Sequence, residues 1–128
     1  MALKGSKTEN NLLTAFAGES QANRTYLAFA KKAEQEGYKQ VAKLFRAAAE
    51  AETVHAHAHL REIGTVKGTK ENLEYMLGGE TMATKEKMDA ARIAKEEGNN
   101  DAATFFERAS ADENRHRSGL QGFLNRMK

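Results

Sequence analysis

The tetrapeptide ETVH (52–55) decides the fold, because it recurs as ENRH (113–116) within a repeat that spans most of the chain. Both stretches place a glutamate three residues before a histidine. On a helix this spacing puts the two side chains on one face, about one turn apart. A single pair of this kind is typical of a solvated helix face. Two pairs in register indicate a shared chemical role.

The repeat aligns without a gap when the sequence is shifted on itself by 61 positions. TENNLLTAFAGES (8–20) then lies over TKENLEYMLGGET (69–81), and AKKAEQEGYKQVAKLF (30–45) lies over ARIAKEEGNNDAATFF (91–106). Apolar residues recur at spacings of three, four and seven in both copies, which is typical of amphipathic helices. Two copies of a helical hairpin are therefore expected.

The first copy, residues 6–63 approximately, is expected to contain two helices. Thr8 is expected to cap the first helix and Gly37 to end it, since glycine suits the left-handed residue after a helix. The second helix is expected from about Tyr38 to Ile63.

The second copy, residues 69–127 approximately, is expected to begin at Thr69, to turn at Gly98 and to continue as a helix over residues 100–127. Residues 64–68 then form a linker. Four helices of about 25 residues with short connections predict an all-α four-helix bundle that forms one domain over residues 1–128.

Composition agrees with this fold and excludes several classes of function. The chain has 128 residues, no proline and no cysteine, which favours helix and excludes disulfides and thiolate metal sites. The net charge is +2 and the charges are interleaved, so neither composition nor charge pattern indicates a nucleic-acid partner. The opening residues lack the apolar segment of a signal peptide, and no run approaches the roughly 18 apolar residues of a membrane span. We therefore expect a cytoplasmic protein that has no membrane partner.

Six ionisable residues are expected on the inward faces of the four helices, near the middle of each: Glu19, Glu52, His55, Glu80, Glu113 and His116. Four carboxylates cannot stay ionised together in a core without compensation, and two divalent cations would balance them. A glutamate from each of two helices with Glu-x-x-His from the other two is the di-iron or di-manganese constellation of ferritin-like bundles. Imidazole and carboxylate ligands favour iron or manganese over magnesium or calcium; zinc is a further candidate.

Two other histidines follow His55 on the same helix. His57 is expected to face away from His55 and to lie at the surface. His59 lies one turn beyond His55. Two interpretations remain open for His59, a residue that supports the metal ligands or a partly exposed residue near the end of the bundle.

The chain resembles the rubrerythrin family over nearly its whole length. The resemblance rests on LKGSKTENNLLTAFAGESQANRTYLAFA (3–30), EGYKQVAKLFRAAAEAETVHA (36–56), ENLEYMLGGET (71–81) and ARIAKEEG (91–98) with DENRH (112–116). It implies a ferritin-like bundle with a non-haem di-iron centre that reduces hydrogen peroxide in oxidative-stress defence. The six residues match its ligand positions, and Tyr26 matches a tyrosine near the site.

The sequence departs from the family pattern at three points. Many members add a rubredoxin-like domain whose four cysteines hold an iron that passes electrons to the di-iron centre. This sequence has no cysteine, so a separate electron donor, such as a rubredoxin or a reductase, is expected. The family's Gly-Glu-x-x-Glu run on the third helix has Ala83 in place of its second glutamate. Glu86 lies six residues after Glu80, well around the helix, and is not expected to replace it. Lys87 occupies the repeat position of Tyr26. It either points toward the metals, where it contacts a ligand carboxylate or peroxide, or extends outward to water.

The function expected from these residues is peroxide reduction at two iron ions, with Tyr26 and Lys87 as candidate catalytic residues. The symmetric set of six ligands is also close to bacterioferritin-like oxidase centres. Two alternatives therefore remain, an oxygen-using ferroxidase that handles iron and a helical dimer whose metals only staple the core.

The linker predicts how the hairpins assemble. In a ferritin-like bundle the second and third helices run parallel, so the connection between them must travel along the bundle. From the level of the ligands it would have to cover about 28 Å, whereas the six Cα–Cα steps from residue 63 to residue 69 reach about 20 Å when fully extended. A domain-swapped homodimer is expected, in which the two hairpins of one chain pair with those of another.

Overall fold

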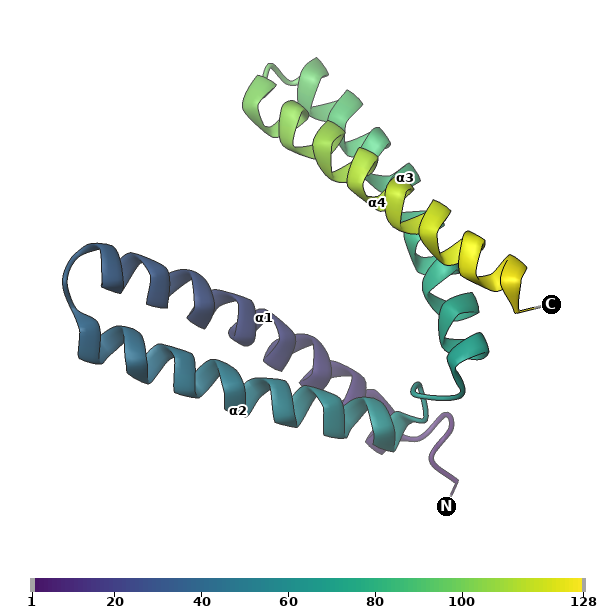
Figure 1. Ribbon diagram of the computed structural model, residues 1–128, viewed down its shortest axis with the longest axis horizontal. Coiled ribbons are helices and arrows are strands. Elements are labelled where there is room, and N and C mark those ends of the chain that lie inside the picture. The colour runs from purple at the N-terminus through teal and green to yellow at the C-terminus, as the bar shows by residue number, and fades with distance from the viewer. Residues whose placement is uncertain (1, 128) are drawn as a thin grey trace. The chain divides into compact units, whose positions relative to one another are not determined.

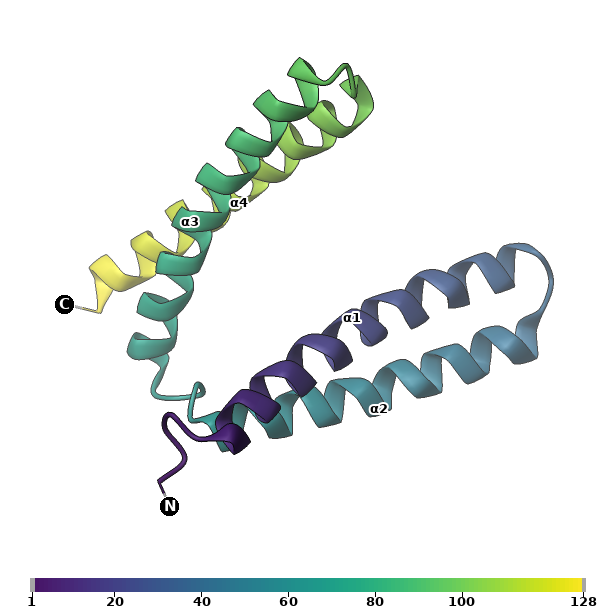
Figure 2. The same cartoon turned by 180° about the vertical axis from the view of Figure 1, so that it is seen from behind.

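The computed structural model describes residues 2–127, which form four α-helices connected as two helical hairpins (Figures 1 and 2). The helices are α1 (Lys7–Gln35), α2 (Lys39–Ile63), α3 (Thr69–Glu96) and α4 (Asn100–Arg126). α1 packs against α2 and α3 packs against α4, and the chain divides into two compact units between Val66 and Lys67. The predicted all-α class and the two repeated hairpins are confirmed. Over the same residues, no helix has the length and apolar character that a membrane span requires.

Glycine ends the first helix of each hairpin, as the sequence predicts. Gly37 has a φ of 87° and Gly98 a φ of 79°, which is the left-handed region that residues with a side chain rarely adopt. Each glycine lies in the short turn between the two helices of its hairpin. The turn reverses the chain direction and allows the second helix to pack against the first.

The start of α1 differs from the prediction that Thr8 caps it. Ser6 is the capping residue, and its Oγ accepts a hydrogen bond from the backbone N–H of Glu9 at 3.1 Å. Glu9 Oε1 in turn accepts from the backbone N–H of Gly5 at 3.1 Å. Ser-x-x-Glu satisfies free N–H groups from both directions, and the helix begins two residues earlier than predicted.

The linker over residues 64–68 is non-helical, and its second half is fastened to the start of α3. Glu71 Oε2 accepts from the N–H of Gly68 at 2.9 Å. The Asn72 side chain exchanges two hydrogen bonds with the backbone of Lys67, each 2.9 Å long. These hydrogen bonds fasten Lys67 and Gly68 to the first turn of α3.

Small side chains form the contact between the two helices of each hairpin. Ala30, Ala33 and Ala42 are buried in the first hairpin, where Phe45 packs against them. Their repeat equivalents Ala91, Ala94 and Ala103 are buried in the second. Alanine allows two helix backbones to approach closely, so each pair of helices packs along this seam and its ligand residues lie on facing turns.

A polar side chain in each hairpin hydrogen-bonds across to the other helix beside the ligand residues. Asn23 is buried, and its Nδ2 donates to the backbone oxygen of Ala49 at 2.7 Å and to Oγ1 of Thr53 at 2.8 Å. At the equivalent positions of the second hairpin, Ser110 Oγ donates to the backbone oxygen of Thr84 at 3.1 Å. The repeat keeps the bond and exchanges the helix that donates it.

Candidate metal centre

The first hairpin brings together Glu19 from α1 with Glu52 and His55 from α2; we call these three residues the first group. One ligand atom from each residue lies within 4.8 Å of the others. Glu19 Oε1 is 3.7 Å from Nδ1 of His55. Glu52 and His55 share one helix face because α2 runs without interruption through both.

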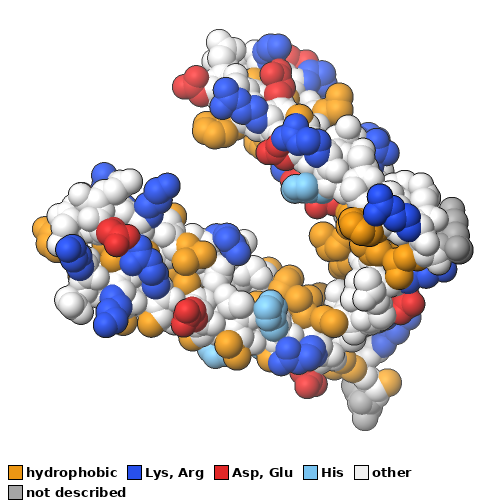
Figure 3. Space-filling model, viewed as in Figure 1, with side chains coloured by type: hydrophobic (Ala, Val, Ile, Leu, Met, Phe, Trp, Pro, Cys, Tyr) orange, Lys and Arg blue, Asp and Glu red, His pale blue; other side chains and the backbone are white. Residues whose placement is uncertain are grey.

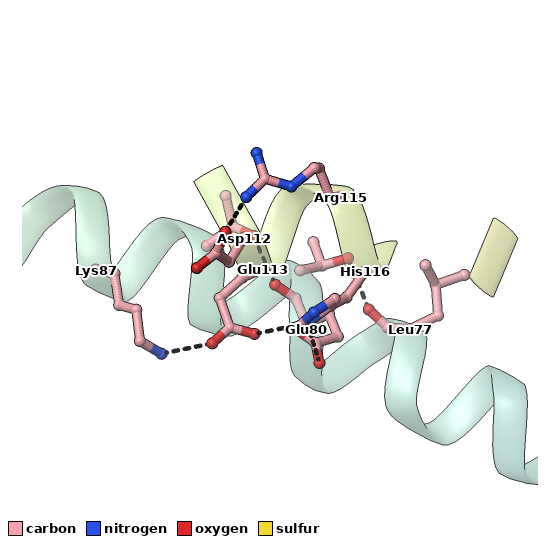
Figure 4. Close-up of polar contacts among 9 residues, drawn as sticks. Leu77, Glu80, Lys87, Asp112, Glu113, Arg115 and His116 are labelled. Carbon is pink, nitrogen blue, oxygen red and sulfur yellow. Dashed lines mark hydrogen bonds and ion pairs between the residues drawn. The ribbon is translucent and has the colours of Figure 1, made fainter. Parts of the chain in front are cut away.

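The second hairpin repeats this arrangement with Glu80 from α3 and Glu113 and His116 from α4; we call these three residues the second group. Their ligand atoms also lie within 4.8 Å of one another. Nδ1 of His116 is 3.5 Å from Glu80 Oε1 and 3.8 Å from Glu113 Oε2, and Figure 4 shows both carboxylates directed toward this imidazole. All six predicted ligand residues are thus gathered, three in each hairpin.

Buried oxygens show that these groups suit a cation. Among residues 2–127, the buried side-chain atoms without a hydrogen-bond partner are Oε2 of Glu19 and Oε2 of Glu80. An unpaired buried carboxylate oxygen is costly, and a metal ion removes the cost by accepting its lone pair. Two carboxylates and one imidazole are ligands that iron and manganese accept. The residues present therefore fit one divalent ion in each group.

The histidines lie at the open edge of each group. The side chain of His55 is 56% exposed and that of His116 is 60% exposed, whereas those of Glu19 and Glu80 are 28% and 13% exposed. The carboxylates from α1 and α3 are therefore the deeper ligands. The imidazoles lie on a helix face that its own hairpin does not cover.

The two carboxylates of the second group interact directly. A hydrogen bond with Glu113, with burial as a further cause, raises the pKa of Glu80 above its usual value. The same hydrogen bond, together with the hydrogen bond from Lys87, lowers the pKa of Glu113. Two acids this close favour sharing one proton, which a metal ion would displace.

Lys87 contacts this pair. Its Nζ lies 3.2 Å from Oε1 of Glu113, and its side chain is 32% exposed (Figure 4). Of the two positions predicted for Lys87, the structure shows the one in which it contacts a ligand carboxylate. The helix places it there because Lys87 follows Glu80 by seven residues, which is two turns along the same face of α3.

Tyr26 holds the equivalent position on α1. Its ring packs against Phe45, with the ring centroids 6.0 Å apart.

Ala83 replaces the usual glutamate of α3, and Glu86 is exposed and outside the second group. No other carboxylate therefore joins the second group among the residues that the structure describes.

The two remaining histidines, His57 and His59, differ in exposure and in contacts. His57 is exposed, as predicted. His59 is partly buried, and its Nε2 lies 2.8 Å from Glu19 Oε2, although the ring is not aligned for a hydrogen bond. The interpretation that treated His59 as a supporting residue thus has a contact in the structure. Its spacing of four from His55 and seven from Glu52 was the available sequence signal.

Comparison with known proteins agrees with this arrangement. The family model described as Rubrerythrin matches residues 10–124. The chain belongs to the rubrerythrin family. It is 39% identical over 129 residues to a rubrerythrin of Porphyromonas gingivalis, covering 90% of this chain and 64% of that protein. A rubrerythrin of Nitratidesulfovibrio vulgaris is 33% identical over 141 residues, covering 99% of this chain and 74% of that protein.

A further relative is an uncharacterized protein of Methanocaldococcus jannaschii, 42% identical over 125 residues, covering 96% of this chain and 88% of the relative. Rubrerythrin membership supports a ferritin-like helical bundle, an iron-binding protein and an oxidoreductase related to oxidative-stress defence. The two groups supply this rubrerythrin-family chain with residues that could bind the metal.

Proposed function

We propose that the chain is a non-haem di-iron oxidoreductase that reduces hydrogen peroxide to water. The observation that supports this most directly is the pair of Glu-Glu-His groups at equivalent positions of the repeat. Iron bound there would supply the two electrons that break the O–O bond. With two protons, these electrons convert one peroxide into two waters.

The protein residues bind the ions, balance their charge and direct peroxide. Four carboxylates neutralise two ferrous ions, so an uncharged substrate enters a site of low net charge. The Lys87 ammonium, held at Glu113, is positioned to donate a hydrogen bond to a peroxide oxygen and to stabilise negative charge that develops on it. Tyr26, fixed by its packing on Phe45, is assigned to order a water near the first group.

The two groups are proposed to combine in one di-metal centre inside a four-helix bundle. Leu44 and His55 are eleven residues apart, which is about three turns, so they share one face of α2. Leu44 is 66% exposed, and its repeat equivalent Phe105, on the face of His116, is 72% exposed. Apolar side chains also lie open along both hairpins in Figure 3. Such faces are expected to be covered by another hairpin.

We propose that a second copy of the chain supplies the covering hairpin. α2 ends at Ile63, about 12 Å beyond the level of His55, and α3 begins at Thr69, about 16 Å before the level of Glu80. The connection would need about 28 Å and reaches about 20 Å. Fastening of Lys67 and Gly68 to α3 shortens this reach further. A swapped dimer meets the requirement without unwinding either helix.

We propose that a cytoplasmic rubredoxin or reductase supplies the electrons, because residues 1–128 contain no cysteine that could hold an iron–sulfur centre. Iron is the proposed metal, with manganese or zinc as competitors for the same ligands.

One observation favours a second function, oxygen-dependent oxidation of ferrous iron. With Ala83 in place of a third-helix glutamate, the two groups have the same ligand composition, as in symmetric oxidase centres. A structural role, with metals that only staple the bundle, remains the alternative from another class.

Anaerobic loading with Fe(II), followed by mixing with peroxide or with oxygen, tests these functions. Fast ferric absorbance with peroxide, followed by re-reduction and repeated turnover, is the expected result. Faster oxidation by oxygen would support the ferroxidase. Iron that reacts with neither oxidant but raises the unfolding temperature would support the structural role.

A further inference from the structure

His59 makes the two groups differ, although their ligand residues are the same. It follows Glu52 by seven residues and therefore lies on the same face of α2. Its repeat equivalent in α4 is Leu120. Neither Glu19 Oε2 nor Glu80 Oε2 accepts a hydrogen bond, but an imidazole nitrogen of His59 lies 2.8 Å from Glu19 Oε2, whereas the second hairpin has leucine at the equivalent position.

The two oxygens of Glu19 have separate partners. Oε1 lies 3.7 Å from His55, a member of the first group, and Oε2 lies 2.8 Å from His59. The second distance lies within the range of a hydrogen bond, although the imidazole N–H is not aligned with Oε2. The His59 side chain is only 24% exposed, less than half the exposure of His55. His59 is therefore held against the carboxylate rather than extended into water.

We propose that His59 is a positioning residue that makes the two metal positions inequivalent; the proposal rests on the di-metal centre proposed above. Rotation of the imidazole aligns its Nε2–H with Glu19 Oε2 and leaves Oε1 as the metal ligand. Glu80, opposite Leu120, keeps both oxygens available for its metal. The first group is thereby preorganised for one-oxygen ligation by Glu19, and the second is not.

His59 acts through Glu19 rather than as a ligand itself. The ligand atoms that lie within 4.8 Å of one another come from Glu19, Glu52 and His55, and His59 is not among them. Residues that orient a ligand carboxylate by hydrogen bonding typically change metal affinity by about tenfold to a hundredfold when removed. That range sets the size of the expected effect.

Cobalt(II) titration of the full chain tests the proposal, with absorbance in the visible region reporting each metal position. His59→Leu gives the first hairpin the residue of the second, and Leu120→His makes the reverse exchange. In His59→Leu, one of the two cobalt sites is expected to weaken by about tenfold or more and to change its absorption spectrum. The other site is expected to keep both affinity and spectrum. Leu120→His is expected to strengthen the second site.

Glu19→Ala and Glu80→Ala identify which cobalt signal belongs to which group. His59→Gln retains an N–H donor and is expected to restore most of the affinity that His59→Leu loses. Circular dichroism and thermal unfolding of the metal-free variants check the fold. If His59→Leu does not fold, His59→Gln and Leu120→His decide. A role for the imidazole predicts that Leu120→His binds cobalt more tightly at the second site and that His59→Gln keeps most of the affinity of the first site. A purely structural role predicts no gain in affinity from Leu120→His.

Titrations and spectra of His59→Leu that coincide with those of the unaltered protein would overturn the role of His59 and leave the metal centre standing. A protein that binds two cobalt ions in identical sites would do the same. Failure of the unaltered protein to bind cobalt at all would overturn the proposed centre, and this inference with it.

Discussion

Lys87 Nζ on α3 lies 3.2 Å from Oε1 of Glu113 on α4, so a cation contacts a carboxylate within the second group. Lys87→Met removes the charge and retains the length of the side chain. We expect two bound iron ions per chain as before, because Lys87 is not a ligand. The rate of oxidation by peroxide should fall by about tenfold or more, since the ammonium no longer stabilises the developing charge. Stopped-flow absorbance after anaerobic loading measures it.

Lys85→Met is the matched control, because Lys85 is exposed and lies on the opposite face of α3. It should leave the rate unchanged. Equal rates for Lys87→Met and the unaltered protein would show that Lys87 only neutralises Glu113.

Glu80→Met should have opposite effects on the metal-free and the metal-loaded protein. In the metal-free protein it removes a buried carboxylate oxygen that has no partner, so the free energy of unfolding should rise by about 1–3 kcal/mol. In the loaded protein it removes a ligand, so one metal ion and its stabilisation should be lost. Urea unfolding with and without a chelator measures both. The exposed Glu86→Met serves as control and should change neither value appreciably; a loss of stability in metal-free Glu80→Met would contradict the argument.

Asn23→Ala should destabilise the first hairpin, because it removes the buried amide that bonds to Ala49 and Thr53. The expected loss is about 1–3 kcal/mol in chemical unfolding of the metal-free protein. Gln21→Ala, at an exposed position of the same helix, is the control and should have little effect. Equal stability of the two variants would mean that the alanine seam alone sets the helix register.

Lengthening the linker should convert a swapped dimer into a monomer. Insertion of about twelve glycine and serine residues after Val66 adds an average span of roughly 20 Å, enough for one chain to complete its own bundle. Light scattering should show a dimer for the unaltered protein and a monomer for the insertion variant, both with two iron ions per chain. A monomeric unaltered protein with its full metal content would refute the swap.

The sequence predicts the helices well because the repeat and the glycines encode them. Gly37 and Gly98 mark both turns, and α2, α3 and α4 begin and end within about one residue of the prediction. The prediction that Thr8 caps α1 is wrong. Ser6 and Thr8 are both good capping residues, and only the backbone shows which one faces the free N–H groups.

The sequence likewise predicts one part of the candidate site, the gathering of its ligand residues, and leaves the contacts of individual oxygens undetermined. Helical spacing brings Glu52 to His55 and Glu113 to His116, so the gathering of the six residues follows from sequence alone. The partners of individual oxygens do not follow, because they depend on side-chain rotamers and on the separation of two packed helices. Lys87 at Glu113 and His59 at Glu19 were each one of two interpretations until the structure showed the contacts.

Anomalous diffraction at the iron edge, from crystals of the protein loaded with Fe(II), tests the di-metal centre most directly. Two iron peaks per chain are predicted, one at Glu19, Glu52 and His55 and one at Glu80, Glu113 and His116. Each should have a neighbouring iron about 3.5–4 Å away. Iron at other residues, or single ions with no second iron nearby, would contradict the account.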